Sequence, residues 1–199
     1  ADQTRPVMIH LLDNAVSPAL LKALCADPPG VPWYGFVRIA PPLDDADFCL
    51  RLAAAGCVML KIGLESGSQA VLDRLEKGVR LEMASRVLDN LHRAGIAAYV
   101  YLLFGTPAED EAAARDTLAF VVDHAEAIGF LNLAIFNLPI GSPDARQLQL
   151  RDFYDGDLAL YRDFHHPAAW DRPAVRRFLE RTFKKHAAVQ PIVRRDPPL

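Results

Sequence analysis

Five short, continuous runs of apolar residues alternate with amphipathic helical segments along most of the chain. The runs cover residues 7–12, 33–39, 58–62, 98–104 and 131–138. Continuous apolar runs of this length fit strands that are buried on both faces, as in parallel sheets. The alternation therefore predicts right-handed βαβ units around a parallel sheet, and both a doubly wound sheet and a barrel satisfy it.

Capping residues and glycines mark the ends of the helices between the runs. Proline suits a first helical turn, Asp and Ser suit the N-cap, and glycine suits the position after the last turn. The expected starts are Pro18, Asp44 or Asp45, and Ser68, and the expected stops are Gly56, Gly78, Gly95 and Gly129.

The alternation is lost after Pro143. We therefore expect a partial barrel over residues 1–143 and a helical extension over residues 144–199 that packs on the same domain. Within the extension, residues 144–150 and 173–188 are expected to be helical. The sequence shows no internal repeat, low-complexity segment or second domain.

Composition excludes several classes of protein. With 199 residues, 51% of them hydrophobic, and a formal net charge of -3, the chain lacks the signatures of disorder and of charge-driven nucleic-acid binding. No signal peptide or membrane-spanning run is visible, so we expect no membrane partner and a cytoplasmic location. The chain also begins without Met, and we interpret it as a fragment of a longer parent protein.

The three cysteines, Cys25, Cys49 and Cys57, form neither a CxxC nor a CxxxCxxC cluster. Each lies in an apolar helical or strand pattern, which is typical of a buried small hydrophobic residue. The histidines also lack metal-ligand spacing, and we predict no metal site held by this chain.

Polar and glycine residues follow each predicted strand, where ligands of parallel α/β folds bind. Singly, each has a structural alternative: Asp13 could cap a turn, and Glu65 could only neutralise Arg38 or Lys61. Their shared placement favours one site. The candidate binding residues are Asp13, Asn14, Arg38, Glu65, Ser66, Gly105 and Asn137.

The residue types indicate the kind of ligand. The carboxylates of Asp13 and Glu65 suit an ammonium group or ribose hydroxyls, and Arg38 suits a carboxylate. The backbone N–H groups of Gly67 and Ser68 suit an anion or a polar oxygen, and Gly105 would let a flat ring approach the backbone. Together these features describe S-adenosylmethionine; a nucleotide satisfies most of them.

Two motifs carry a resemblance to a known family. The run Ile62-Gly63-Leu64-Glu65-Ser66-Gly67-Ser68-Gln69, with Lys77-Gly78 after it, resembles the fourth-strand segment of radical S-adenosylmethionine enzymes. Phe104-Gly105-Thr106-Pro107-Ala108-Glu109 resembles the fifth-strand GxPxE turn of that family. The match extends in order over residues 7–143, and the most similar subgroup often carries a cobalamin-binding domain.

The resemblance implies an incomplete parallel (β/α) barrel with C-terminal helices, and a parent enzyme that uses a [4Fe–4S] cluster to cleave S-adenosylmethionine and start radical chemistry. It assigns the amino group of the cofactor to Asp13, with Asn14 beside it, and ribose or carboxylate contacts to Glu65 and Ser66. It also places adenine near Gly105 and Asn137, and makes Arg38 a partner for the carboxylate. The CxxxCxxC loop that binds the cluster in the family is absent from this sequence.

We therefore expect the chain alone to be inactive, with cobalamin an open question and the catalytic residues and substrate unknown. The rival interpretations are a barrel enzyme that binds a nucleotide or phosphorylated metabolite, and a degenerate barrel that acts as a binding module. We also expect self-association through the exposed edge of the first strand, residues 7–12, because bare strand edges recruit partners.

Overall fold

A computed structural model of the chain describes residues 5–151 and 160–197. Its centre is a five-stranded parallel sheet of β1 (Ile9–Leu11), β2 (Trp33–Val37), β3 (Cys57–Glu65), β4 (Ala97–Phe104) and β5 (Ile128–Ile135). The strands are hydrogen-bonded in sequence order, β1-β2-β3-β4-β5. A doubly wound sheet reverses this order at a switch point, so the order confirms the incomplete barrel.

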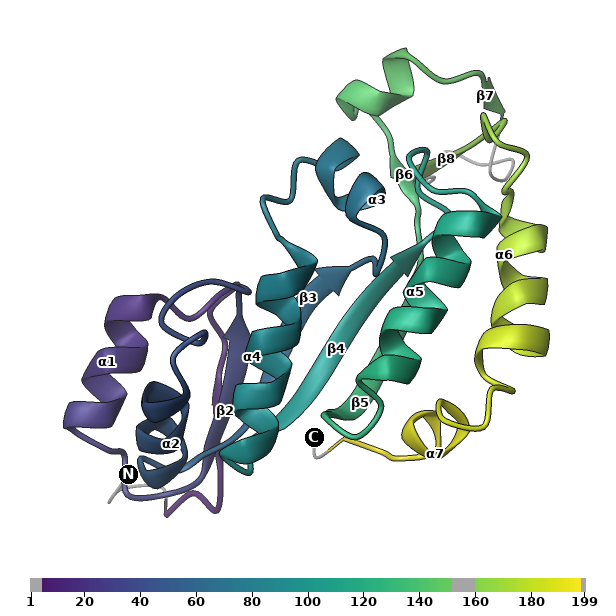
Figure 1. Ribbon diagram of the computed structural model, residues 1–199. Coiled ribbons are helices and arrows are strands. Elements are labelled where there is room, and N and C mark those ends of the chain that lie inside the picture. The colour runs from purple at the N-terminus through teal and green to yellow at the C-terminus, as the bar shows by residue number, and fades with distance from the viewer. Residues whose placement is uncertain (1–4, 152–159, 198–199) are drawn as a thin grey trace.

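Helices connect successive strands and lie on one side of the sheet (Figure 1). They are α1 (Pro18–Ala26), α2 (Ala46–Ala54), α3 (Gln69–Arg74), α4 (Leu81–Arg93) and α5 (Glu111–Asp123). The predicted starts at Pro18 and Asp45 are confirmed, and Ser68 occupies the N-cap position of α3 without a side-chain capping bond. No helix within residues 5–151 and 160–197 has the length and hydrophobicity to cross a membrane.

Alternation along β3 and β4 separates two faces of the sheet. Ile62, Leu64, Val100 and Leu102 are fully buried, and they belong to the core that packs against the helices. The residues between them, such as Lys61 and Tyr101, point to the opposite face and are half-buried. In a barrel this opposite face is the interior.

Beyond the carboxyl ends of β4 and β5 lies a small antiparallel sheet of β6 (Leu138–Pro139), β8 (Tyr161–Phe164) and β7 (Leu150–Arg151) (Figure 1). The prediction of a helix over residues 144–150 is wrong. A short 3₁₀ helix, η1 (Pro143–Arg146), forms instead and precedes β7. Pairing with β8 decides this, since Arg151 forms a 2.6 Å ion pair with Asp163 across the two strands. Tertiary pairing thus overrides the local helical pattern.

The helix expected over residues 173–188 forms only in part. It consists of α6 (Arg172–Phe178) and a π-helical turn, η2 (Leu179–Phe183), and α7 (Gln190–Val193) follows. Lys184 N–H donates to the carbonyl of Leu179, and this wider spacing brings Phe178 and Phe183 to the same side. Both rings contact Phe104 in the core, which accounts for the π turn.

Two of the glycines that were predicted to end helices do not do so. Gly129 lies inside β5 rather than at a helix end, and α3 ends at Arg74, before Gly78. At Gly129 a Cβ atom would lie 3.3 Å from the Ala98 carbonyl oxygen, so the residue permits close approach of neighbouring strands. Gly56 and Gly95 follow their helices with positive φ, as predicted.

Candidate cofactor-binding site

A cleft of about 920 Å³ opens at the carboxyl ends of β2 and β3. Asn14, Arg38 and Glu65 of the predicted site line this cleft. Its far wall is the segment after α3, which includes Lys77 and Gly78. Both residues belong to the first family-like motif of the sequence, but Lys77 was not among the predicted site residues.

Glu65 ends β3 in an unusual backbone conformation. Its φ is 69°, in the left-handed region that non-glycine residues rarely adopt, and the register of β3 against β4 shifts between Gly63 and Glu65. Glu65 Oε1 lies 2.9 Å from Lys77 Nζ, and a Cβ atom on Gly63 would be 3.2 Å from the same oxygen. The conformation thus folds the carboxylate back over Gly63, along the cleft.

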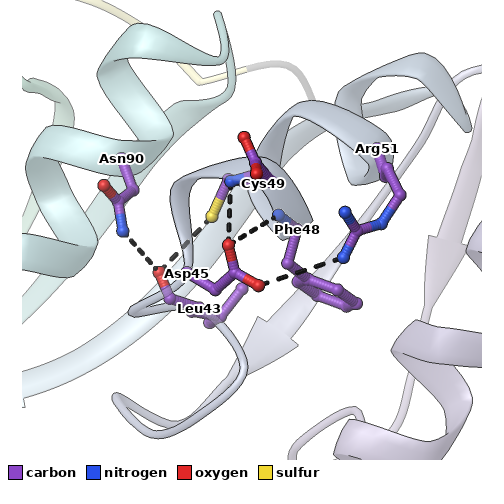
Figure 2. Close-up of polar contacts among 7 residues, drawn as sticks. Leu43, Asp45, Phe48, Cys49, Arg51 and Asn90 are labelled. Carbon is purple, nitrogen blue, oxygen red and sulfur yellow. Dashed lines mark hydrogen bonds and ion pairs between the residues drawn. The ribbon is translucent and has the colours of Figure 1, made fainter.

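The loop between β2 and α2 forms another wall of the cleft, through Arg38, Ile39 and Leu43. Figure 2 shows how this loop is anchored. The Leu43 carbonyl accepts hydrogen bonds from Asn90 Nδ2 of α4 at 3.2 Å and from Cys49 Sγ at 3.4 Å. These bonds hold the wall against the helices.

Asp45, in the same loop, caps α2. Its Oδ1 accepts from the backbone N–H groups of Asp47 and Phe48, and Oδ2 lies 4.0 Å from Arg51 (Figure 2). The ion pair is exposed and contributes little to stability. The cap is the stronger local determinant, typically worth about 1 kcal/mol.

The Gly-Ser turn after Glu65 faces the protein interior. Ser66 is fully buried and its Oγ lies 3.2 Å from Thr117 Oγ1 of α5. Gly67 N–H donates to the same Thr117 oxygen, and Ser68 N–H donates to Ser66 Oγ. The expectation that the Gly67 and Ser68 N–H groups receive a ligand is therefore wrong, because both already have acceptors inside the protein.

Gly105 lies apart from the cleft, under the C-terminal segment. Its φ is 77°, and a Cβ atom there would lie 3.2 Å from Val175 Cγ2. It lines a cavity of only about 20 Å³, so the space beside this glycine is filled by the protein itself. The side chain of Asn137 accepts a hydrogen bond from Arg172, and Asp13 is exposed next to Asn14. All seven candidates lie near the carboxyl ends of strands, but only three line the cleft.

Glu109, the last residue of the GxPxE turn, is buried and was not among the predicted site residues. Glu109 Oε2 accepts hydrogen bonds from Gly105 N–H at 2.5 Å and from Trp170 Nε1 at 2.9 Å. Its other carboxylate oxygen is buried without a partner among the described residues. Burial raises the pKa of this carboxyl to about 7, against the two hydrogen bonds that lower it. The Glu109 side chain therefore links the turn after β4 to the C-terminal segment through its hydrogen bonds.

His166 supports the same junction. Its Nε2 lies 2.8 Å from the Thr106 carbonyl, and its Nδ1 accepts from the N–H groups of Ala168 and Trp170. In this arrangement Nδ1 is the acceptor and Nε2 is placed to donate to the Thr106 carbonyl. Neither Glu109 nor His166 lines the large cleft, and we interpret both as structural.

The cysteines do not fit an iron–sulfur cluster. Cys25 lies in α1, Cys49 in α2 and Cys57 at the start of β3, and all three are free. Burial raises the pKa of Cys49 to about 11 and raises that of Cys57 further, which opposes the thiolates that a cluster needs. The residues that the structure describes hold no group of His, Cys, Asp and Glu suited to a metal ion.

We accordingly expect anaerobic reconstitution of this chain with iron and sulfide to yield no stoichiometric [4Fe–4S] cluster. Absorption and electron paramagnetic resonance spectroscopy would measure the outcome. A stoichiometric cluster in the monomeric chain would contradict the placement of the three thiols.

Comparison with known families decides what kind of fold carries this cleft. The family described as the radical SAM superfamily matches residues 14–121, more than half of the 199 residues. The chain belongs to the radical SAM superfamily. The matched residues include β2 to β4 and the walls of the cleft. A comparison with curated protein sequences finds no significant match.

Solved structures of radical SAM proteins share the fold. TsrM, a radical S-adenosylmethionine methyltransferase from Kitasatospora setae with cobalamin and a [4Fe-4S] cluster bound, is 22% identical, with a TM-score of 0.59 over 83% of this chain and 37% of its own. Coproporphyrinogen III oxidase (HemN) from Escherichia coli is 17% identical, with a TM-score of 0.53 over 65% of this chain and 32% of its own.

The cobalamin-dependent radical enzyme OxsB is 16% identical, with a TM-score of 0.52 over 95% of this chain and 25% of its own. The radical SAM chain thus spans between a quarter and two fifths of the length of these three proteins. At this level of identity the similarity establishes the shared fold.

Proposed function

We propose that this radical SAM chain forms the wall that binds S-adenosylmethionine in a longer enzyme, with the Glu65 end of β3 at its centre. The observation that carries the proposal is the left-handed Glu65 backbone, which turns a carboxylate along a large cleft beside Lys77. Strained backbone conformations of this kind cluster at ligand sites. A volume of about 920 Å³ lies near the upper end of the range for ligand pockets, roughly 300–1,000 Å³.

Each charged group in the cleft has a counterpart on the cofactor. We assign the Glu65 carboxylate to the ribose hydroxyls and the cations Arg38 and Lys77 to the methionine carboxylate. Asp13, exposed beside the cleft residue Asn14, is assigned to the methionine ammonium, as the resemblance implies. The chain's own work is then to bind and orient S-adenosylmethionine.

The proposed activity belongs to the longer parent. Reductive cleavage of S-adenosylmethionine needs a [4Fe–4S] cluster, and the three cysteines of this chain do not supply its ligands. The suggestion that the parent enzyme also uses cobalamin rests on the motif resemblance alone, and we assign no residue of the chain to cobalamin binding.

Thermal unfolding with added ligands tests the proposal against its rivals. We expect S-adenosylmethionine to raise the melting temperature of the chain and ATP, at the same concentration, to leave it unchanged. A ligand that binds only the folded state stabilises it in proportion to the logarithm of its concentration. Stabilisation by ATP instead would favour a nucleotide-binding enzyme, and no shift with either compound would favour a binding module.

We expect Glu65→Gly to separate binding from stability. Glycine relieves the strain of the left-handed backbone, so the free energy of unfolding should change by no more than about 1 kcal/mol after loss of the Lys77 ion pair. Loss of the ribose contact should weaken S-adenosylmethionine binding roughly 5- to 150-fold, equivalent to about 1–3 kcal/mol. Calorimetric titration measures the affinity, and chemical denaturation measures the stability.

Ala169→Gly is the matched control, because Ala169 also has a positive φ, of 53°, is exposed and lies outside the cleft. Its affinity for S-adenosylmethionine should stay within about twofold of the parent chain. Equal affinity of the Glu65→Gly variant and the parent would rule out the role given to Glu65.

A further inference from the structure

Aromatic side chains gather on the inner face of the sheet, opposite the helices. We call Tyr34, Phe36, Tyr99, Tyr101 and Phe130 the aromatic floor. Phe36 meets Tyr101 edge-on with ring centres 5.1 Å apart, Tyr101 lies 4.8 Å from Tyr99, and Tyr99 lies 5.8 Å from Phe130. These rings come from three strands and, apart from the buried Tyr34, are half-buried.

The aromatic floor is continuous with the cleft. Phe36 and Gly63, which share the inner face, also line the cleft. A side chain at position 63 would meet Phe36, whose Cε1 would lie 3.6 Å from its Cβ atom, and the Glu65 carboxylate on the other side. Glycine therefore leaves the path between the floor and the Glu65 end of β3 open.

One ammonium group lies on the floor. Lys61 is in the middle of β3, the central strand, and its Nζ lies 5.1 Å from the centre of the Tyr34 ring. Within residues 5–151 and 160–197, the structure gives Lys61 this cation–π contact and no ion-pair partner. A half-buried ammonium group among aromatic rings is available to pair with an anion, and the described chain provides none.

The other titratable groups near Lys61 do not supply that anion. His10 stacks on Tyr34 with ring centres 4.3 Å apart, and desolvation followed by the Lys61 charge lowers its pKa. Burial, and then Tyr99, raise the pKa of Tyr101. At neutral pH the imidazole and the phenol are therefore uncharged, and the positive charge of the floor is that of Lys61.

Spacing along β3 sets the size of a ligand. At about 3.3 Å per residue, Lys61 is about 7 Å from Gly63 and about 13 Å from Glu65 along the strand. An anionic group at Lys61 thus leaves room for one or two fused rings between it and the cleft. Rings that merely filled a barrel interior would not need a charged side chain among them.

We propose that the aromatic floor binds the aromatic body of the substrate and that the Lys61 ammonium pairs with the carboxylate of that substrate. The ligand class is a flat aromatic carboxylic acid. Its role as a substrate rests on the proposed function, because the floor opens into the cleft assigned to S-adenosylmethionine, whereas its binding to the floor does not.

Ligand-detected NMR titration of the 199-residue chain tests the binding with three probes. These are 2-naphthylacetate, the uncharged 2-naphthylacetamide, and cyclohexylacetate, which keeps the charge without the aromatic ring. We expect 2-naphthylacetate to bind at least tenfold more tightly than either of the others. Equal binding of the acid and the amide, or no binding of the acid, would overturn the proposal.

Variants locate the site. Lys61→Met should weaken 2-naphthylacetate binding at least tenfold and leave 2-naphthylacetamide binding unchanged, and Lys61→Arg should stay within about threefold of the parent. Lys22→Met, which removes an exposed lysine from α1, is the matched control and should change nothing. Unchanged binding of the acid by Lys61→Met would refute the role of Lys61, and circular dichroism would verify that each variant is folded.

The same samples distinguish the two proposals. The shift in melting temperature with S-adenosylmethionine should be the same in Lys61→Met and in the parent. If 2-naphthylacetate binds through Lys61 but S-adenosylmethionine does not stabilise the chain, the proposed function fails and the aromatic-acid site stands. If S-adenosylmethionine stabilises the chain but 2-naphthylacetate does not bind through Lys61, only the aromatic-acid site is refuted.

Discussion

Gly67→Ala is expected to destabilise the chain by at least about 3 kcal/mol, the upper end of the usual cost of overpacking a core. A Cβ atom at this position would lie 2.7 Å from both the Thr117 Cα and the Phe120 Cβ of α5. Neither atom is the end of a flexible side chain, so α5 itself would have to move. Chemical denaturation followed by circular dichroism measures the loss.

Gly95→Ala is the control for this substitution. Gly95 has a φ of 73° and open space around it, so alanine there costs only the strain of a left-handed backbone, about 1–2 kcal/mol. A Gly67→Ala variant as stable as Gly95→Ala would mean that the Gly-Ser turn is not packed against α5 as described. The motif glycine would then have to be explained by the cofactor.

Glu109→Gln should stabilise the chain above neutral pH. The pKa of Glu109 is raised from 4.5 to about 7 in the folded state, so between these values the folded chain holds a proton that the unfolded chain has released. The stability of the parent should therefore fall as the pH rises from about 4.5 to 7 and level off above that. A shift of this size corresponds to about 3 kcal/mol.

The glutamine variant should lack this slope. Its side-chain oxygen can accept the same bonds from Gly105 N–H and Trp170 Nε1, and its amide group does not titrate. The stability of the variant relative to the parent should therefore rise by about 3 kcal/mol between pH 4 and pH 8. Urea denaturation across this pH range is the measurement. Glu126→Gln, at an exposed carboxylate, should keep the parent's slope. A parent chain whose stability did not fall between pH 4.5 and 7 would disprove the raised pKa.

The sequence was sufficient for the order of elements but not for the barrel. Continuous apolar runs are a local property, and they marked all five parallel strands to within a few residues. Whether the strands form a doubly wound or a barrel order depends on which strands pair. The apolar runs alone fit both arrangements. The family-like motifs favour the barrel, and the observed strand order agrees with a barrel.

Candidate site residues were found because strand ends in a parallel sheet must meet at one edge. This rule located Asn14, Arg38 and Glu65 at the cleft. It could not separate residues that face the cleft from those that face the helices, because adjacent residues in one turn point in opposite directions. Ser66 therefore looked equivalent to Glu65, although its hydroxyl is bonded to Thr117, 51 positions along the chain.

What the sequence by itself determined is the alternation of strands and helices, the helix starts at Pro18 and Asp45, and the radical SAM motifs, because each depends on neighbouring residues. Only the tertiary structure decided that Lys77 faces Glu65, that Glu109 is buried beside Trp170, and that Leu150 and Arg151 form a strand. These outcomes depend on the desolvation of charges and on hydrogen bonds between distant segments, which exist only after the chain has folded.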